Sequence, residues 1–227
     1  MREAVLWGQH VDEYQRMFSL TDSDFDSQLL EYCSGVTAVN AELHARHQSM
    51  ISCDPWFSLD KDMLLKKVTA NFEASICEVK AARSRYNFID DEHFEGLIER
   101  RREGIAQCLA DYEKGREEKR YLPMNNDLLP FEDFSFDLAL SSYFFFAGTE
   151  SQDEAFHLQR IRELTRVAKE VRIFPLIDRE GQPSHLLGPV LLGLQQSNYG
   201  VEIREVNDHL QKGSHAMLRV WARECPV

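Results

Sequence analysis

The stretch LPFEDFSFDLALSSYFFF, residues 129–146, joins a polar, turn-rich half to a hydrophobic half. The apolar run from Phe136 to Ser142 is typical of a buried strand. Three polar residues, Ser141, Ser142 and Tyr143, stand where that strand is expected to end. In an open α/β sheet, ligands bind beyond the carboxyl ends of the strands. The stretch therefore predicts a buried strand whose end contacts a small polar ligand.

Strand and helix patterns alternate along the rest of the chain. We expect strands at 27–33, 49–54, 120–124 and 170–177, and helices at 3–19, 36–47, 152–168 and 188–196. Thr149 and Ser151 are possible caps of the third helix. The final segments, 201–206 and 215–222, suggest an antiparallel hairpin. This order predicts an α/β fold with a doubly wound, mostly parallel sheet of seven strands.

Residues 59–118 are helical in pattern, highly charged and devoid of any strand signal. A link between two parallel strands needs far fewer residues. We interpret the segment as a helical insertion in a single domain that spans 1–227. It either folds over a cleft as a lid or forms a dimerisation hairpin, and both alternatives stay open at this stage.

Charge and cysteine usage narrow the class of protein. A net charge of −12 repels nucleic-acid backbones, and a solvated helix face explains the basic cluster at Arg100–Arg102 better than a nucleic-acid contact does. The five cysteines are widely spaced and include no CxxC pair, which indicates reduced thiols and no zinc site. With no signal peptide or span-length apolar run in view, we expect a soluble, cytoplasmic protein without metal.

Two segments carry a resemblance to a known family. LPFEDFSFDLALSS resembles the LPFxDxSFDxVxSS segment of class I S-adenosylmethionine-dependent methyltransferases. FHLQRIRELTRVAKEVRIFPL, residues 156–176, resembles the family's helix with a Glu-(Leu/Met)-x-Arg-Val motif and the strand after it. The terminal hairpin also matches, so the resemblance covers about 27–58 and 119–223. It implies a Rossmann-like sheet, S-adenosylmethionine as cofactor and a small-molecule methyl acceptor.

The chain departs from the family in its first loop. The family's loop is usually acidic-x-Gly-x-Gly-x-Gly, whereas this chain has EYCSGVT at 31–37, which keeps the acid and one glycine. Asn125 and Asn126 stand near the place of the usual aspartate after the third strand. Because glycine lets a backbone approach a ligand closely, its loss reshapes the pocket. A catalytically degenerate ligand-binding or interaction module is therefore an alternative, as are a nucleotide-dependent oxidoreductase and an assembly protein built on 59–118.

The resemblance places the cofactor at the strand ends. The residues expected to bind it are Glu31, Cys33, Ser34, Gly35, Asp54, Pro55, Asn125, Asn126, Ser141 and Ser142. Glu31 either meets the charged amino-acid end of the cofactor or is satisfied by an arginine or a backbone amide. Asp54 accepts hydrogen bonds from ribose hydroxyls or caps the turn before Pro55. The loops after residues 33, 54, 124 and 142 should converge on one groove.

Tyr143 and His157 are the candidates for catalytic work. Tyr143 either bounds the substrate pocket or packs under a helix. The near-neutral pKa typical of histidine suits a general base, although a surface or capping role for His157 is an alternative. Glu163 and Arg166, three residues apart on the same expected helix, can pair.

Overall fold

The computed structural model describes residues 7–124, 128–146, 152–178 and 180–222. Its sheet has seven strands in the order β3-β2-β1-β4-β5-β7-β6. They are β1 (Leu29–Tyr32), β2 (Met50–Asp54), β3 (Tyr121–Pro123), β4 (Phe136–Ser142), β5 (Ala168–Phe174), β6 (Tyr199–Glu205) and β7 (Ala216–Ala222). The first five pair in parallel, and β7 runs antiparallel to both β5 and β6. The predicted fold class is confirmed, and the antiparallel hairpin contradicts the oxidoreductase alternative.

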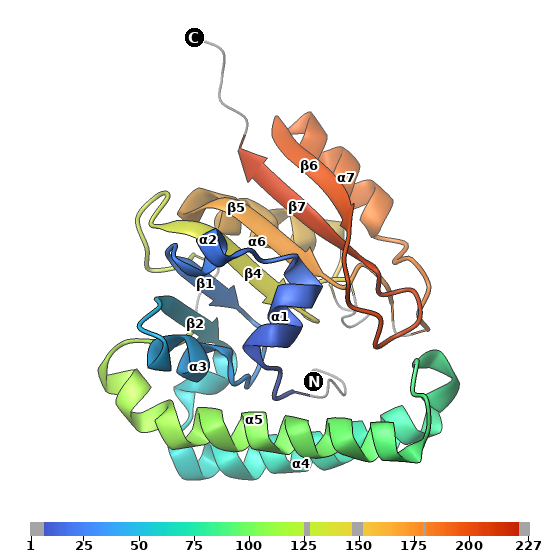
Figure 1. The fold of residues 1–227 in the computed structure, drawn as a ribbon. Coiled ribbons are helices and arrows are strands. Elements are labelled where there is room, and N and C mark those ends of the chain that lie inside the picture. Colours follow the sequence, from blue (N-terminus) through green and yellow to red (C-terminus); the bar gives the residue numbers. More distant parts are fainter. Residues whose placement is uncertain (1–6, 125–127, 147–151, 179, 223–227) are drawn as a thin grey trace.

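Helices cover both faces of the sheet (Figure 1). α1 (Val11–Phe18) and α3 (Val39–Ala45) pack on one face, and α6 (Glu154–Val167) and α7 (Leu187–Gln196) pack on the other. Successive side chains of a strand point to opposite faces. Leu138 and Leu140 of β4 accordingly join the core under α1, whereas Ala139 joins the core under α6. A short helix, α2 (Asp22–Phe25), follows α1 and was not predicted.

The first helix begins later than the 3–19 pattern predicted. Residues 7–10, here called the N-terminal strap, have no helical structure, and α1 starts at Val11. Gly8 has a φ of +91°, which ends any helix there. The backbone N–H of His10 donates to Glu13 Oε2 at 2.9 Å, which closes a capping box at the true start. The cap of α6 also differs, because Asp153 fills that place, whereas Thr149 and Ser151 lie outside the described residues.

The predicted helical insertion forms a hairpin of α4 (Lys61–Ala81) and α5 (Asp91–Glu117), joined through η2 (Arg83–Arg85) and preceded by η1 (Pro55–Ser58). We call residues 61–117 the arch. In Figure 1 the arch runs along the lower edge of the molecule, and its turn approaches the β6–β7 loop. The 27 residues of α5 span about 40 Å at 1.5 Å per residue. The six spacings between seven strands, at about 4.8 Å each, span only about 29 Å, so α5 is long enough to cross the whole edge.

Contacts along the arch show that it follows the carboxyl ends of the parallel strands. The hydroxyl of Tyr112 donates to the carbonyl of Leu59, beyond β2, at 2.8 Å. At the other end, the N–H of Asn87 donates to the carbonyl of Leu210, beyond β6, at 2.9 Å. The arch therefore lies over the edge of the sheet where the sequence places the ligand.

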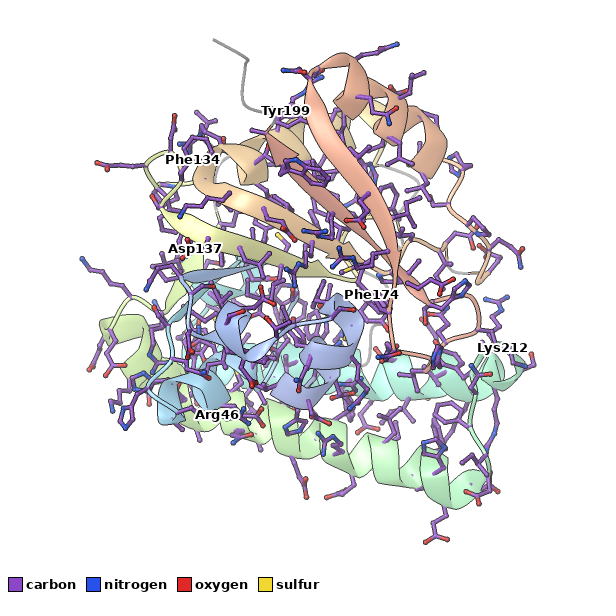
Figure 2. All side chains as sticks on the ribbon, turned by 45° about the horizontal axis from the view of Figure 1, so that its top comes forward. Arg46, Phe134, Asp137, Phe174, Tyr199 and Lys212 are labelled. Atoms are coloured by element: carbon purple, nitrogen blue, oxygen red, sulfur yellow. The ribbon has the colours of Figure 1, made fainter. Side chains whose placement is uncertain are left out.

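The two family-like segments are bound to each other through Arg166. Its guanidinium donates to the carbonyls of Leu129 and Phe131 at 3.1 and 2.9 Å. It also pairs with Glu163 at 2.7 Å, and Glu163 in turn accepts the Leu129 N–H. The predicted pair is confirmed, and it fixes the turn that leads into β4. Figure 2 shows Phe134 on that turn, at the amino end of β4 and away from the ligand edge.

Candidate functional site

The loops after β1, β2 and β4 meet at the carboxyl edge of the sheet. The N–H of Gly35, after β1, donates to Asp54 Oδ2, at the end of β2, at 3.0 Å. The N–H of Ser142, at the end of β4, donates to Ser34 Oγ at 3.1 Å. The order of strands reverses direction between β1 and β4, which is where open α/β sheets bind ligands. The predicted meeting of these three loops is thus observed, whereas the groove expected between them stays a prediction.

Cys33 makes the first turn of this loop without a glycine. Its φ is +54°, in the left-handed region, and it stands where the resembling family carries its first glycine. The Cys33 thiol lies 3.5 Å from the sulfur of Met124, which follows β3, so the β3 end joins the same cluster. Asn125 and Asn126, the next two residues, lie outside the described part of the chain.

Glu31 is the buried centre of the site. Its carboxylate accepts hydrogen bonds from three hydroxyls, those of Tyr14 at 2.6 Å, Thr37 at 2.8 Å and Ser52 at 2.6 Å. Burial raises the pKa of Glu31 despite these donors. The sequence offered an arginine or a backbone amide as its internal partner, but hydroxyls from α1, the first loop and β2 satisfy it instead. The network locks three elements together at the switch point.

Asp54 is engaged by the backbone around it. Besides the Gly35 N–H, it accepts the N–H of Trp56 at 2.9 Å and so caps η1. Only 1% of Asp54 is exposed, although Pro55, the next residue, is exposed. The capping role is therefore what the structure shows, and a contact with ribose needs the cover over Asp54 to move.

Trp7 of the N-terminal strap covers Gly35, the residue whose N–H bonds to Asp54. A Cβ atom added to Gly35 would lie 2.3 Å from the Trp7 indole, so the ring rests directly on this glycine. Trp7 is 2% exposed and meets Trp56 edge-on, with ring centroids 4.6 Å apart. The resemblance places S-adenosylmethionine on this same surface, above the one glycine that the loop retains. With Trp7 there, the residues do not fit the cofactor.

Two buried polar side chains at this edge have no hydrogen-bond partner among the described residues. They are Gln9, both of whose amide heteroatoms are unsatisfied, and Ser141, whose hydroxyl is unsatisfied. Gln9 is fully buried. Leaving a buried polar group unpaired costs about 1–3 kcal/mol. Such groups are uncommon in folded proteins, and a bound ligand is one way to satisfy them.

His157 is buried rather than on a helix surface. Its Nδ1 lies 2.8 Å from the Asp153 carbonyl, and its Nε2 accepts the Phe146 N–H at 3.3 Å. Burial lowers the pKa of His157. With both ring nitrogens engaged and 1% of the residue exposed, His157 fastens the segment after β4 to the start of α6.

Tyr143 occupies the turn directly after β4. Its φ is +54°, uncommon for a bulky residue and often found at functional sites. The ring packs edge-on against Phe174 at 5.8 Å. Burial and the nearby charge of Asp208 raise the pKa of the Tyr143 hydroxyl well above its usual range. Phe144–Phe146 lie in the core under α6.

The basic cluster on α5 is neutralised within the chain. Arg101, predicted to be solvated, is instead buried and pairs with Glu13 of α1 at 2.7 Å. Arg100 pairs with Asp12, and Arg102 has glutamates at 3.6 and 3.5 Å. Arg101 therefore ties the arch to α1 beside the strap.

A groove lies at the other end of the carboxyl edge, between the turn of the arch and the β6–β7 loop. Its volume is about 530 Å³, and it is lined by Asn87, Glu205, Val206, Asn207, His209, Gln211, Lys212, Gly213 and His215. Figure 2 shows Lys212 on that loop, beside the turn of the arch. β6 is three positions from β4 in the sheet, a separation of about 14 Å. The groove is thus remote from the loops around Gly35.

The described residues contain no cluster of three or more histidine, cysteine or acidic side chains that could hold a metal ion. Burial raises the pKa of the Cys108 thiol to about 12, and the pKa of Cys53 is raised further.

Within the described residues, no helix combines the length and apolar character that crossing a bilayer requires.

Sequence reasoning missed the residues that complete the site. The helix predicted at 3–19 includes Trp7 and Gln9, which the structure places in the strap. The hydrogen bonds of Tyr14, Thr37 and Ser52 to Glu31 were not predicted. Gly8 was the available signal, because an isolated glycine inside a helical pattern weakens a helix prediction. The Glu31 partners come from separate segments, and their spacing in sequence gives no sign of the contact.

Comparison with known proteins supports the fold. No family model matches the chain. An uncharacterized protein of Methanocaldococcus jannaschii is 24% identical over 219 residues, which are 96% of both chains. The structure of the PH0226 protein from Pyrococcus horikoshii superposes with a TM-score of 0.50 at 12% identity, covering 97% of this chain and 94% of that one.

Other similar structures are those of methyltransferases. A SAM-dependent methyltransferase from Methanosarcina mazei gives a TM-score of 0.45 at 12% identity, covering 95% of this chain and 98% of that chain. TrmN from Thermus thermophilus gives 0.48 at 13% identity, and although 92% of this chain is covered, it spans only 48% of the TrmN chain. The chain therefore shares the α/β fold of the PH0226 protein, with a mostly parallel seven-stranded sheet that ends in an antiparallel hairpin. The loops around Gly35 are the ones at which the sequence resemblance predicted the cofactor.

Proposed function

We propose that the protein is an S-adenosylmethionine-dependent methyltransferase acting on a small molecule. The observation that supports it best is the joining of the β1, β2 and β4 loops at the switch point of this fold, through the Gly35–Asp54 and Ser34–Ser142 bonds. The cofactor would supply an activated methyl group. The chain would bind and orient the two reactants, and orientation alone is worth up to about 7–11 kcal/mol.

The chain's own residues would shape the edge that receives the ligand. Glu31 holds α1, the first loop and β2 together, and Ser34 holds the first loop against β4. Asp54 and Gly35 would contact the cofactor once Trp7 has left the glycine. The remaining expected contacts, Cys33, Pro55, Asn125, Asn126, Ser141 and Ser142, stay predictions.

On the acceptor side, the arch is best explained as a cover for the edge. Its two ends bind segments beyond β2 and beyond β6, so it would exclude water from a reaction beneath it. We propose that the polar groove beside β6 holds the part of the methyl acceptor that does not react. This groove is remote from the reaction because β6 lies about 14 Å from β4. A homodimer through the arch stays a prediction; Met63 and Leu65 are exposed there.

A degenerate methyltransferase-like binding protein is the second candidate, and Trp7 on Gly35 is the observation that favours it. For either candidate we propose a cytoplasmic protein, because the described cysteines are free thiols. The two candidates differ in turnover, since the degenerate protein would transfer no methyl group.

Calorimetry with S-adenosylhomocysteine tests the proposal. We expect binding to the wild type and its loss in Asp54→Ala, with Asp60→Ala, which removes the cap of α4 at an exposed position, as the matched control. At a concentration 100 times the dissociation constant, the ligand should stabilise the fold by about 2.7 kcal/mol. Binding equal in both variants would contradict the placement of the site. Absence of binding both to the wild type and to Trp7→Ala, which removes the ring that covers Gly35, would contradict the function.

A further inference from the structure

The N-terminal strap has a fixed end and a pivot. At His10, Nδ1 lies 2.6 Å from Glu42 Oε1 and Nε2 lies 3.0 Å from the Arg100 carbonyl, so the strap is anchored to α3 and the arch. Gly8, two residues earlier, has a φ of +91°, and its missing side chain leaves room for the Arg101 carbonyl. Trp7 lies beyond that pivot.

The rest of the strap is held by few polar contacts. The Gly8 N–H donates to the Val36 carbonyl, and the Ala38 N–H donates to the Gln9 carbonyl, both at 2.8 Å. The Gln9 side chain makes no hydrogen bond to any described residue although it is fully buried. Closing the strap therefore buries a primary amide that no described residue compensates, which favours opening. The closed position depends mainly on the packing of Trp7.

Trp7 also has the shape of the group it excludes. Its flat two-ring indole lies on the Gly35 backbone and meets Trp56, which follows the end of β2. A purine is likewise a flat two-ring system that packs on aromatic side chains. The surface formed by Gly35 and Trp56 can hold one such ring at a time.

We propose that the strap is an autoinhibitory gate in which Trp7 occupies the nucleoside position of the cofactor site and leaves it when the cofactor binds. This proposal rests on the proposed function. The open form is then the minor state of the free protein, and the apparent affinity is reduced by the fraction of molecules that are open. Any partner or modification that holds the strap away from Gly35 activates the protein.

Two substitutions with opposite expected effects test the gate, with S-adenosylhomocysteine as the probe in calorimetry. Trp7→Ala removes the competing ring and should tighten binding about tenfold or more, as for a site that is open less than about a tenth of the time. Gln9→Met replaces the unsatisfied amide by an apolar side chain of similar length. It should raise the melting temperature of the free protein and weaken binding, because it stabilises the closed strap.

A spectroscopic measurement follows the gate without turnover. The edge-on Trp7–Trp56 pair should give a coupled near-ultraviolet circular dichroism signal that disappears when the ligand binds. Trp221→Phe, on β7, is the control and should leave that signal intact.

The outcomes separate the gate from the function. Binding to the wild type that Trp7→Ala leaves unchanged or weakens overturns the gate and leaves the proposed function standing. Binding to neither protein overturns both. Gln9→Met that weakens binding without raising the melting temperature of the free protein identifies Gln9 as a direct ligand contact and overturns the gate.

Discussion

The two ends of the carboxyl edge differ in how the chain closes them. Around Gly35, an indole ring, a buried carboxylate network and capped backbone groups fill the space, and Asp54 is 1% exposed. Between the arch and the β6–β7 loop, a polar groove of about 530 Å³ stays open. The same arch passes over both ends, so the cover alone does not decide which end is closed.

The two ends differ in the residues that follow the strands and in the contacts these residues make. At the closed end, loops carry glycine, serine and acidic residues that bond to one another and leave a flat surface that an aromatic ring can cover. At the open end, backbone and amide hydrogen bonds join the arch to the loop, for example Asn87 Nδ2 to the His209 carbonyl at 2.6 Å. Most of the residues that line the groove are exposed, although Val206 is buried. The packing of Trp7 covers the first end, whereas hydrogen bonds join the arch to the β6–β7 loop at the second.

The largest expected effect is that of Gly35→Ala. The new methyl group would meet the Trp7 ring at 2.3 Å, at a φ of +79°. A left-handed conformation costs an L-residue roughly 1–2 kcal/mol, and overpacking adds about 1–3 kcal/mol. Urea denaturation should therefore show a loss of about 3 kcal/mol in the free energy of unfolding.

Gly181→Ala is the matched control for that prediction. Gly181 has nearly the same φ, +77°, but its nearest neighbour is the Lys212 carbonyl at 3.2 Å. In Gly181→Ala the free energy of unfolding should fall only by the cost of the left-handed conformation, roughly 1–2 kcal/mol. Equal losses in the two variants would show that Trp7 does not pack on Gly35.

Tyr14→Phe should give the next largest loss in the free energy of unfolding, about 1–3 kcal/mol, because it removes one donor from the buried Glu31 carboxylate. The control is Tyr86→Phe near the open end, where the ring stacks on Phe88 and no hydroxyl bond is found within the described ranges. Its free energy of unfolding should change by less than about 0.5 kcal/mol. A Tyr14→Phe variant as stable as the control would show that the network does not hold the closed end together.

The sheet was predictable because its signals are local. β4 and β5 appear as apolar runs, and the acids Glu31 and Asp54 stand at the ends of their strands in the sequence itself. The pairing of Glu163 with Arg166 follows from helical spacing. The arch was also predictable as a helical insertion, because residues 59–118 have a charged helical pattern and no strand signal.

The closure of the site was not predictable, because it depends on contacts between distant segments. Trp7 reaches Gly35 because the chain turns at Gly8, which has a positive φ. The apolar pattern of the sequence instead predicts a helix on both sides of Gly8. The burial of Arg101 depends on Glu13 lying opposite it. A cluster of three arginines gives no sign of which one faces inward.

His157 gives a smaller effect that depends on pH. Burial holds its pKa below the usual value, so the folded state resists a proton that the unfolded state takes up near pH 6.5. Its contribution to stability is present above that pH and is lost as the pH falls. The advantage of the wild type over His157→Gln in melting temperature should therefore shrink from pH 8 to pH 5. His185→Gln, at an exposed position, should give a curve parallel to the wild type, and a constant advantage of the wild type over His157→Gln would mean that His157 is not held neutral.

The smallest expected effect on stability is at the open end. Asn87→Ala removes the bond to the His209 carbonyl, but because Asn87 is exposed, water replaces the lost partner and the loss should stay below about 1 kcal/mol. Hydrogen exchange should nevertheless become faster at the N–H groups of Asn87 and Lys212, which join the arch to the loop, because local opening needs less free energy than global unfolding. Asn207→Ala, in the same groove, should leave both rates unchanged. Unchanged exchange in Asn87→Ala would mean that packing holds the arch at this end too, and the contrast between the two ends would then lie in the strap alone.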